Sequence, residues 1–270
     1  MREKPFENTP DPRFLFQSDD TADVFIRLLY TLKSNRGAAL LTGESGCGKT
    51  LLIRALLQQL DPERTEIALI NDPGRTAVDF LREVLYQLGE ETATQDRTEI
   101  LHRIHEVLNG FHTEGKETIV VIDEGQLMED PAVLEEIRLL VNFQLNDAFL
   151  ITMLLAGKEP LADRIRSSPP LDQRIATRGI LTPLGRDDVH HYVAHRLAVA
   201  GRKEPVFSAD ALDLVHGFTE GIPRMVNNIC DISLVIGYGR KLDSVDADGC
   251  AVWFRRRRAR ECKSLTWHSE

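Results

Sequence analysis

A short glycine-rich segment constrains this chain more than any other part of its sequence. It fits the pattern G-x-x-x-x-G-K-S/T of a phosphate-binding loop and reads Gly43-Glu44-Ser45-Gly46-Cys47-Gly48-Lys49-Thr50. Its glycines let the backbone curl, so that successive N–H groups face one anion. We therefore predict that this loop binds ATP with Mg²⁺. Lys49 would reach the β- and γ-phosphates, and the Thr50 hydroxyl would bind the metal.

The residues on both sides of this loop have the composition that a strand, a loop and a helix require. Residues 37–42 are a short apolar run, typical of a buried strand. Residues 51–60 are apolar on most faces, typical of a buried helix, and Asp61-Pro62 ends it. The alternative is a glycine-rich loop with an incidental lysine. The order of elements favours the phosphate loop, because the positive end of the helix would then point at the phosphates.

A second apolar run ends in two acidic residues. Residues 118–122 are β-branched and apolar, which predicts a central parallel strand, and Asp123-Glu124 follows directly. Acidic residues at the carboxyl end of such a strand lie beside the nucleotide crevice of an α/β sheet. We predict that Asp123 holds Mg²⁺, directly or through water, and that Glu124 is the base for the attacking water. The alternative is that the pair only caps the next helix.

The size and composition of the chain fit a globular ATP-binding protein. Its 270 residues allow one sizeable α/β core and a small second domain. No apolar run approaches the roughly 20 residues of a membrane span, and the N-terminal residues carry no secretory signal. The four cysteines show no CxxC spacing. These observations predict a cytoplasmic protein with reduced thiols.

The charge of the chain is uneven along the sequence. The formal net charge is −9, yet residues 252–270 are basic because they contain Arg255–Arg258 and Arg260. A basic helix end can bind nucleic acid, an anionic membrane or an acidic partner, or it can simply complement the helix dipole. The acidic remainder argues against nonspecific coating of DNA. DNA therefore stays open as a partner of the basic segment.

The order of predicted elements changes after residue 183. Strands are expected at 37–42, 66–70, 118–122, 149–156 and 178–181, and they alternate with helices. From there on only helices are expected, at 187–200, 209–218, 223–237 and 245–260. We predict an α/β nucleotide-binding domain at residues 1–184, built as a parallel sheet with helices on both faces. A helical lid domain with the basic C-terminal segment would occupy residues 185–270.

Together, the phosphate loop, the acidic strand end and a helical domain carrying Gly221-Ile222-Pro223-Arg224 resemble an AAA+ P-loop ATPase. More narrowly, the chain resembles the ExeA-like family (general secretion pathway protein A) and its short relatives in pilus assembly. The matching residues are Pro5-Phe6, 9–16, 43–50, 123–126, 138–143, Arg196-Leu197 and Ala200-Gly201. The resemblance covers nearly the whole chain and implies ATP hydrolysis by a homo-oligomer, either a ring or a filament.

The resemblance also implies roles for three arginines. Arg224 resembles the arginine that reaches from the lid to the γ-phosphate; the alternative is a surface arginine at a helix start. Arg174 precedes the last strand, where such ATPases carry an arginine finger for the neighbouring subunit, and Arg178 is the second candidate. A finger supplied in trans makes hydrolysis depend on assembly. The chain departs from the family at Lys158, which places a cation where a neutral amide is usual.

Three functions follow from this resemblance. The first is a motor or switch in a secretion or pilus-assembly system. It would act with an unidentified protein partner, in the cytoplasm or peripherally at the inner membrane through that partner. The second is a DNA-associated regulator of the transposition type. The third is a scaffold that binds nucleotide and hydrolyses it slowly. A metal site at His191 and His195 has the right helical spacing, but no third ligand is evident, so we expect a helix face with ordinary histidines.

Overall fold

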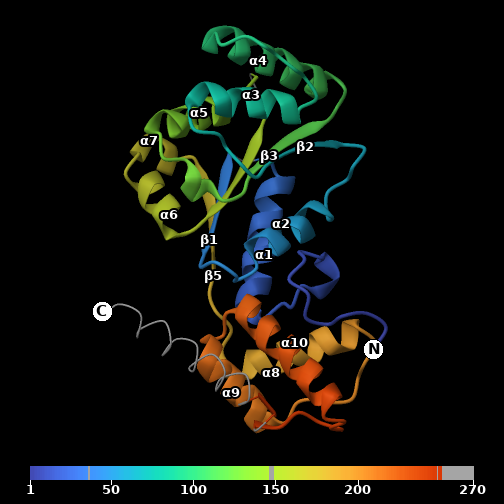
Figure 1. The fold of residues 1–270 in the computed structure, drawn as a ribbon. Helices are drawn as coiled ribbons and strands as arrows, with labels where there is room; N and C mark the ends of the chain where they lie inside the picture. Colours follow the sequence, from blue (N-terminus) through green and yellow to red (C-terminus); the bar gives the residue numbers. More distant parts are fainter. Residues whose placement is uncertain (36, 146–148, 248, 251–270) are drawn as a thin grey trace, which may run out of the picture. The chain divides into compact units, whose positions relative to one another are not determined.

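The computed structural model describes residues 1–35, 37–145, 149–247 and 249–250 (Figure 1). Internal contacts divide the chain into two compact units. The α/β unit consists of residues 19–45 and 49–181, and the helical unit consists of residues 1–18, 46–48 and 182 onward. Residues 1–18 group with the C-terminal helices in this division. The predicted domains, 1–184 and 185–270, remain a proposal, and the basic segment 252–270 lies outside the described residues.

The α/β unit is built on a five-stranded parallel sheet in the order β2-β3-β4-β1-β5. Its strands are β1 (Ala38–Gly43), β2 (Thr65–Ile70), β3 (Glu117–Ile122), β4 (Thr152–Gly157) and β5 (Ile175–Leu181). The predicted α/β fold is therefore confirmed. The strand expected from residue 149 begins only at Thr152, because Phe149 forms an isolated antiparallel bridge with Gln144 instead.

The register brings the carboxyl ends of three strands to one edge of the sheet. Thr42 of β1 pairs with Gly157 of β4, and Ile122 of β3 pairs with Leu155 of β4. Because β4 lies between β3 and β1, its end separates the segment that follows β3 from the segment that follows β1. Segments at the carboxyl ends of parallel strands are where an open α/β sheet binds ligands.

Helices cover both faces of this sheet (Figure 1). One face is covered by α3 (Ala77–Gln87), α4 (Arg97–Thr113), α5 (Pro131–Val141), α6 (Glu159–Arg166) and α7 (Pro169–Asp172). The other face is covered by α1 (Asp19–Lys33) and α2 (Lys49–Leu57). The helix α1 packs so closely on β5 that a Cβ added to Gly179 would lie 2.6 Å from Val24 Cγ1.

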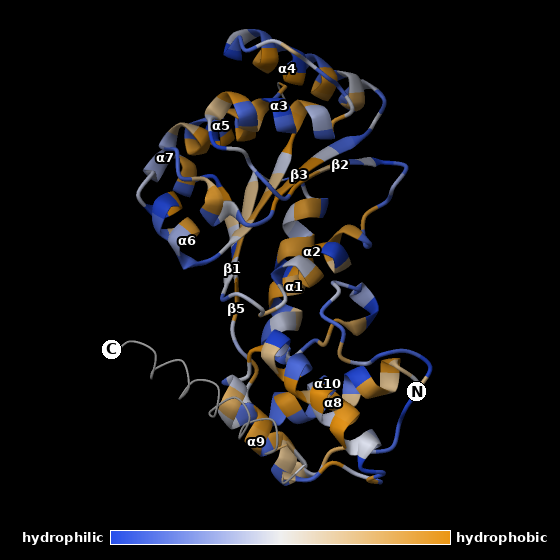
Figure 2. Ribbon diagram, viewed as in Figure 1, coloured by the Kyte–Doolittle hydropathy of each residue, from blue (hydrophilic) through white to orange (hydrophobic). Residues whose placement is uncertain are grey.

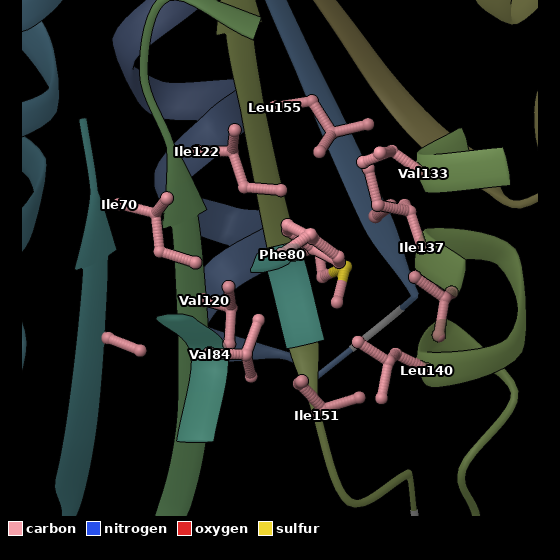
Figure 3. Packing of buried hydrophobic residues seen from close by; sticks show 14 of the residues in the cluster. Ile70, Phe80, Val84, Val120, Ile122, Val133, Ile137, Leu140, Ile151 and Leu155 are labelled. Carbon is pink, nitrogen blue, oxygen red and sulfur yellow. The ribbon is translucent and has the colours of Figure 1, made fainter. Parts of the chain in front are cut away.

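Side-chain alternation along the strands explains this two-faced core. Val120 and Ile122 of β3 point to the same face as Leu155 of β4, and there they meet Phe80 of α3 and Ile137 of α5 (Figure 3). Intervening residues such as Leu41 and Val121 are also fully buried, on the opposite face. Since each buried side chain of this size contributes about 1.5–3 kcal/mol, the double burial fixes the position of the strand ends.

Among its described residues, the helical unit contains a short 3₁₀ helix, η1 (Pro12–Phe14), and three α-helices. The α-helices are α8 (Arg186–Val199), α9 (Ala209–Thr219) and α10 (Pro223–Gly239). Their apolar faces form a second core, visible as hydrophobic stripes in Figure 2. The Ser208 hydroxyl accepts the Ala211 N–H and caps α9, and Pro223 opens α10, as the sequence predicts. Most of the helix expected at 245–260 lies outside the described residues.

The N-terminal segment is bound to these helices by a buried arginine. Arg196 of α8 is only 3% exposed. It donates from Nε to the Pro5 carbonyl at 2.6 Å and from Nη2 to the Glu7 carbonyl at 2.9 Å. Its guanidinium also lies over the Phe14 ring, 4.7 Å from the centroid. This segment is therefore held against the helices, with Phe6 and Phe14 buried in the helical unit. No helix among the described residues could cross a membrane.

Candidate nucleotide site

The glycine-rich segment connects the end of β1 at Gly43 to the start of α2 at Lys49. Gly46 and Gly48 have φ of +91° and +99°, values that residues with a Cβ rarely adopt. A Cβ added to Gly48 would meet no atom within 4 Å, so the backbone conformation and not the packing requires glycine there. The loop is thus curled and has open space beside Gly48, as a phosphate cradle requires.

Lys49 is oriented back across the start of this loop. Its side chain is buried, and Nζ donates hydrogen bonds to the carbonyls of Gly43 at 2.8 Å and Glu44 at 3.0 Å. A buried ammonium is costly unless its protons are bonded. These carbonyls therefore hold the cation beside the loop, where an anionic phosphate would add a stronger partner.

Thr50 and Asp123 lie together although they are far apart in the sequence. The Thr50 hydroxyl donates to Asp123 Oδ2 at 2.6 Å, and Asp123 is 3% exposed. Hydroxyl and carboxylate oxygens are the hard ligands that Mg²⁺ takes, usually one or two from the protein and the rest from phosphate and water. The described residues hold no group of three or more His, Cys, Asp or Glu suited to a metal. The pair thus offers one hydroxyl and one carboxylate of the kind that Mg²⁺ takes from a protein.

Glu124 follows in a left-handed backbone conformation, with φ +52° and ψ +34°. Its N–H donates to Asp123 Oδ1 at 2.8 Å. It precedes the short 3₁₀ helix η2 (Gly125–Leu127), yet its side chain makes no capping hydrogen bond there. The local conformation is one that non-glycine residues adopt mainly when the surroundings impose it. The carboxylate thus stands at the strand end and does not serve as a helix cap.

The Glu124 carboxylate has a partner to which the sequence analysis assigned no role. Gln126 Nε2 donates to Glu124 Oε2. The other end of the same amide, Gln126 Oε1, accepts the Lys158 N–H at 2.9 Å. Arg164 of α6 donates to the carbonyl of Gln126 at 3.0 Å and to the carbonyl of Met128. The sequence marks this network only by glycines at positions 125 and 157, where an added Cβ would lie within 2.9 Å of neighbouring side chains.

Arg224 begins α10 within the helical unit, to which the loop tip Gly46–Gly48 also belongs. The Arg224 N–H donates to the Gly46 carbonyl at 3.2 Å. A Cβ added to Gly46 would lie 2.9 Å from Arg224 Cβ. The Arg224 side chain is exposed and forms no ion pair with any described residue. The arginine is therefore adjacent to the loop tip and available to an anion.

Arg174 and Arg178 lie elsewhere on the α/β unit. The carbonyl of Arg174 accepts the Ala38 N–H at 3.1 Å, so this exposed residue lies at the amino ends of β1 and β5. The phosphate loop follows the opposite ends of these strands. The two positions are five residue steps apart along β1, from Ala38 to Gly43, about 17 Å at 3.3 Å per step. Arg178 is half-buried and pairs with Asp172, 2.6 Å from Nη2 to Oδ1.

The remaining candidates behave as ordinary polar residues. Lys158 is exposed directly after β4 and forms no side-chain hydrogen bond or ion pair with the described residues. His195 lies 5.9 Å from Phe16, ring centroid to ring centroid. Burial lowers the pKa of His195 below its usual range, and nearby Arg196 lowers it further.

Known proteins resemble this chain in both sequence and fold. Residues 32–165 match the family described as AAA domain. General secretion pathway protein A of Aeromonas hydrophila is 38% identical over 244 residues, which cover 89% of this chain and 44% of the relative. The chain therefore spans less than half the length of that relative.

Two solved structures share the fold at low sequence identity. The ORC2 protein of Aeropyrum pernix in its ADPNP-ADP complexes has a TM-score of 0.69 at 16% identity and covers 92% of this chain and 70% of its own. The ORC1 protein of the same organism in complex with DNA also has a TM-score of 0.69 at 16% identity, with coverages of 93% and 68%. At this identity the likeness concerns the fold alone.

Proposed function

Through residues 32–165 the chain belongs to the AAA domain family, and from that premise we propose that it binds ATP with Mg²⁺ and hydrolyses it to ADP and phosphate. The observation that carries the proposal is the 2.6 Å hydrogen bond from Thr50 to Asp123. It joins the hydroxyl of the phosphate loop to the carboxylate at the end of β3. These are the two groups that a magnesium-dependent phosphoryl transfer needs side by side.

The residues of the loop would bind the triphosphate. Main-chain N–H groups of residues 43–50 would donate to its oxygens, and Lys49 would exchange its two carbonyl contacts for stronger contacts with phosphate. Thr50 and Asp123 would hold Mg²⁺, which neutralises charge on the phosphates when it is bound. Glu124 would orient one water and accept its proton, because its carboxylate stands beside Asp123 at the strand end.

The arginines would complete the site in different ways. Arg224 would bind the phosphates. The hydrogen bond from its backbone N–H to the Gly46 carbonyl at the loop tip supports this role. Arg174 lies at the wrong edge of the sheet to reach its own loop, which favours a role in the site of a neighbouring copy. Arg178 is the weaker candidate, since its guanidinium is already paired with Asp172. Hydrolysis would then require a homo-oligomer.

The biological setting is proposed from the relatives. Similarity to general secretion pathway protein A favours a motor or switch in secretion or pilus assembly. The protein would then act in the cytoplasm, or at the inner membrane through a protein partner. A DNA-associated regulator is the second candidate, because a structure with the same fold is bound to DNA. A scaffold with slow hydrolysis is the third, and the rate of turnover separates it from the others.

Two variants, each with a matched control, test this proposal by ATP binding and turnover. Lys49→Ala should lose at least about tenfold in ATP affinity, the value of one charged hydrogen bond, measured by titration calorimetry. Glu124→Gln should keep its affinity and lose about a hundredfold or more in kcat, measured by phosphate release. The exposed residues Lys33 and Glu129 provide the controls Lys33→Ala and Glu129→Gln. Wild-type affinity in Lys49→Ala, or wild-type kcat in Glu124→Gln, would refute the assignment concerned.

A further inference from the structure

We propose that Gln126 is a positioning residue for hydrolysis, whose side-chain amide holds the Glu124 carboxylate and anchors it to the backbone where β4 ends. The inference rests on the proposed function, because it concerns the reaction in which Glu124 is the base. Gln126 would not touch substrate itself. It would act by fixing the direction in which Glu124 presents its free oxygen.

The chemistry of an amide suits this position. Glu124 Oε2 can only accept a hydrogen bond and the Lys158 N–H can only donate one, so the residue between them must donate at one end and accept at the other. A glutamine amide does both. A glutamate would accept at both ends, and a lysine or arginine would donate at both. The two partners also fix which end of the amide is nitrogen.

The surroundings hold Gln126 in this orientation. A Cβ added to Gly157 would lie 2.8 Å from Gln126 Oε1, so the end of β4 has no room for a larger residue. A Cβ added to Gly125 would lie 2.9 Å from Leu161 Cδ2. Arg164 binds the carbonyl of Gln126 at 3.0 Å. Backbone and side chain are thus fixed from separate elements, which leaves the amide few alternative rotamers.

The anchor matters because Glu124 has little else to orient it. Its side chain is only partly buried, and the residue is in a left-handed conformation at the end of β3. Lys158 follows β4, which lies between β3 and β1 in the sheet. Gln126 therefore holds the Glu124 carboxylate at a fixed position relative to β4, the central strand of the sheet. It occupies Oε2 and leaves Oε1 to accept from water, and an error of about 1 Å in such an alignment can cost about a hundredfold in rate.

Two substitutions of Gln126 test whether it positions the Glu124 carboxylate or only anchors the loop through the Lys158 N–H. Gln126→Met loses both hydrogen bonds. Gln126→Glu can still accept the Lys158 N–H but places a second carboxylate against Glu124. We expect kcat for ATP hydrolysis to fall about tenfold or more in both, while the Kd for ATP changes by less than about twofold. Gln87→Glu is the matched control, because Gln87 Nε2 donates to Glu83 Oε1 at 2.9 Å on α3, away from the site.

Amide hydrogen exchange at Lys158, measured by NMR, gives a second readout on the full chain without nucleotide. Exchange should be faster in Gln126→Met than in wild type, and unchanged in Gln126→Glu and Gln87→Glu. If Gln126→Glu keeps the wild-type kcat and only Gln126→Met loses it, then Gln126 only anchors the loop to the Lys158 N–H. That result would overturn the inference. Unchanged exchange in Gln126→Met would overturn it as well.

The failure of this inference can be told apart from the failure of the proposed function. If Glu124→Gln is inactive and both Gln126 variants turn over at the wild-type rate, only the role of Gln126 is wrong. If Glu124→Gln itself turns over at the wild-type rate, the base has been misassigned and the inference falls with it.

Discussion

At the scale of single residues, the chemistry of the site depends on contacts that join distant parts of the sequence. Motif spacing predicted that Thr50 and Asp123 would lie close together, because each follows a strand of one parallel sheet. It could not predict the role of Gln126. That residue is fixed by a hydrogen bond to Lys158, 32 positions away, and such a contact leaves no period in the sequence.

The location of Arg174 leads to a prediction about mixed assemblies. Arg174→Ala should bind ATP normally and lose about a thousandfold or more in kcat, because an arginine finger contributes at least that much. Mixed with Lys49→Ala subunits, which still offer Arg174, it should regain part of its phosphate release. Arg178→Ala is the comparison, since its guanidinium is engaged with Asp172. Absence of rescue would favour Arg178 or hydrolysis within a single copy.

At the scale of elements, apolar runs and caps predicted most of the fold. The strands β1, β3 and β4 are near-continuous apolar runs because they are buried on both faces, and this signal located them. The edge strand β5 is only partly buried, and it begins at Ile175, three residues before the predicted start. The start of β4 was placed too early, since Phe149 to Ile151 are as apolar as the strand and differ only in pairing. The short helices α6 and α7 were not predicted. Helices of this length depend on tertiary packing more than on local propensity.

The contact between α8 and α9 predicts a response to acid. Asp213 of α9 accepts from Arg186 and His190 of α8, and these hydrogen bonds, led by Arg186, lower its pKa to about 2. Because the folded pKa is below the unfolded value of about 3.9, the pair stabilises the fold above that value. The contribution is lost as the pH falls through about 2. The difference in Tm between wild type and Asp213→Asn should therefore be full at pH 6 and shrink between pH 4 and pH 2.

The control for Asp213 is a second carboxylate on α9. Asp210→Asn, which changes an exposed carboxylate in the first turn of the same helix, is the control for the loss of one surface charge. A difference in Tm between wild type and Asp213→Asn that stays constant down to pH 2 would contradict the assignment of the pair.

At the scale of the whole molecule, the proposed finger requires self-association, and ATP should promote it. Light scattering should give a multiple of the chain mass with ATP and Mg²⁺, and a smaller species without them. Lys49→Ala should remain small under both conditions.

Added duplex DNA distinguishes the two leading functions. An increase in mass on adding DNA would favour the DNA-associated regulator. A mass that is the same with and without DNA would favour a role in secretion or pilus assembly. Wild type that stays a monomer with ATP would contradict a finger supplied in trans.

The buried Arg196 has a consequence for proteolysis of this protein. Its guanidinium is bonded to the carbonyls of Pro5 and Glu7 and lies over the Phe14 ring. A protease that cut after Ser18 would therefore not release a loose tail. The cleaved peptide would stay bound until the helices opened. Removing it would take away two of the three oxygens that accept from this guanidinium and leave the Tyr192 hydroxyl, at a cost of about 1.5–3 kcal/mol for each lost hydrogen bond to the charged group.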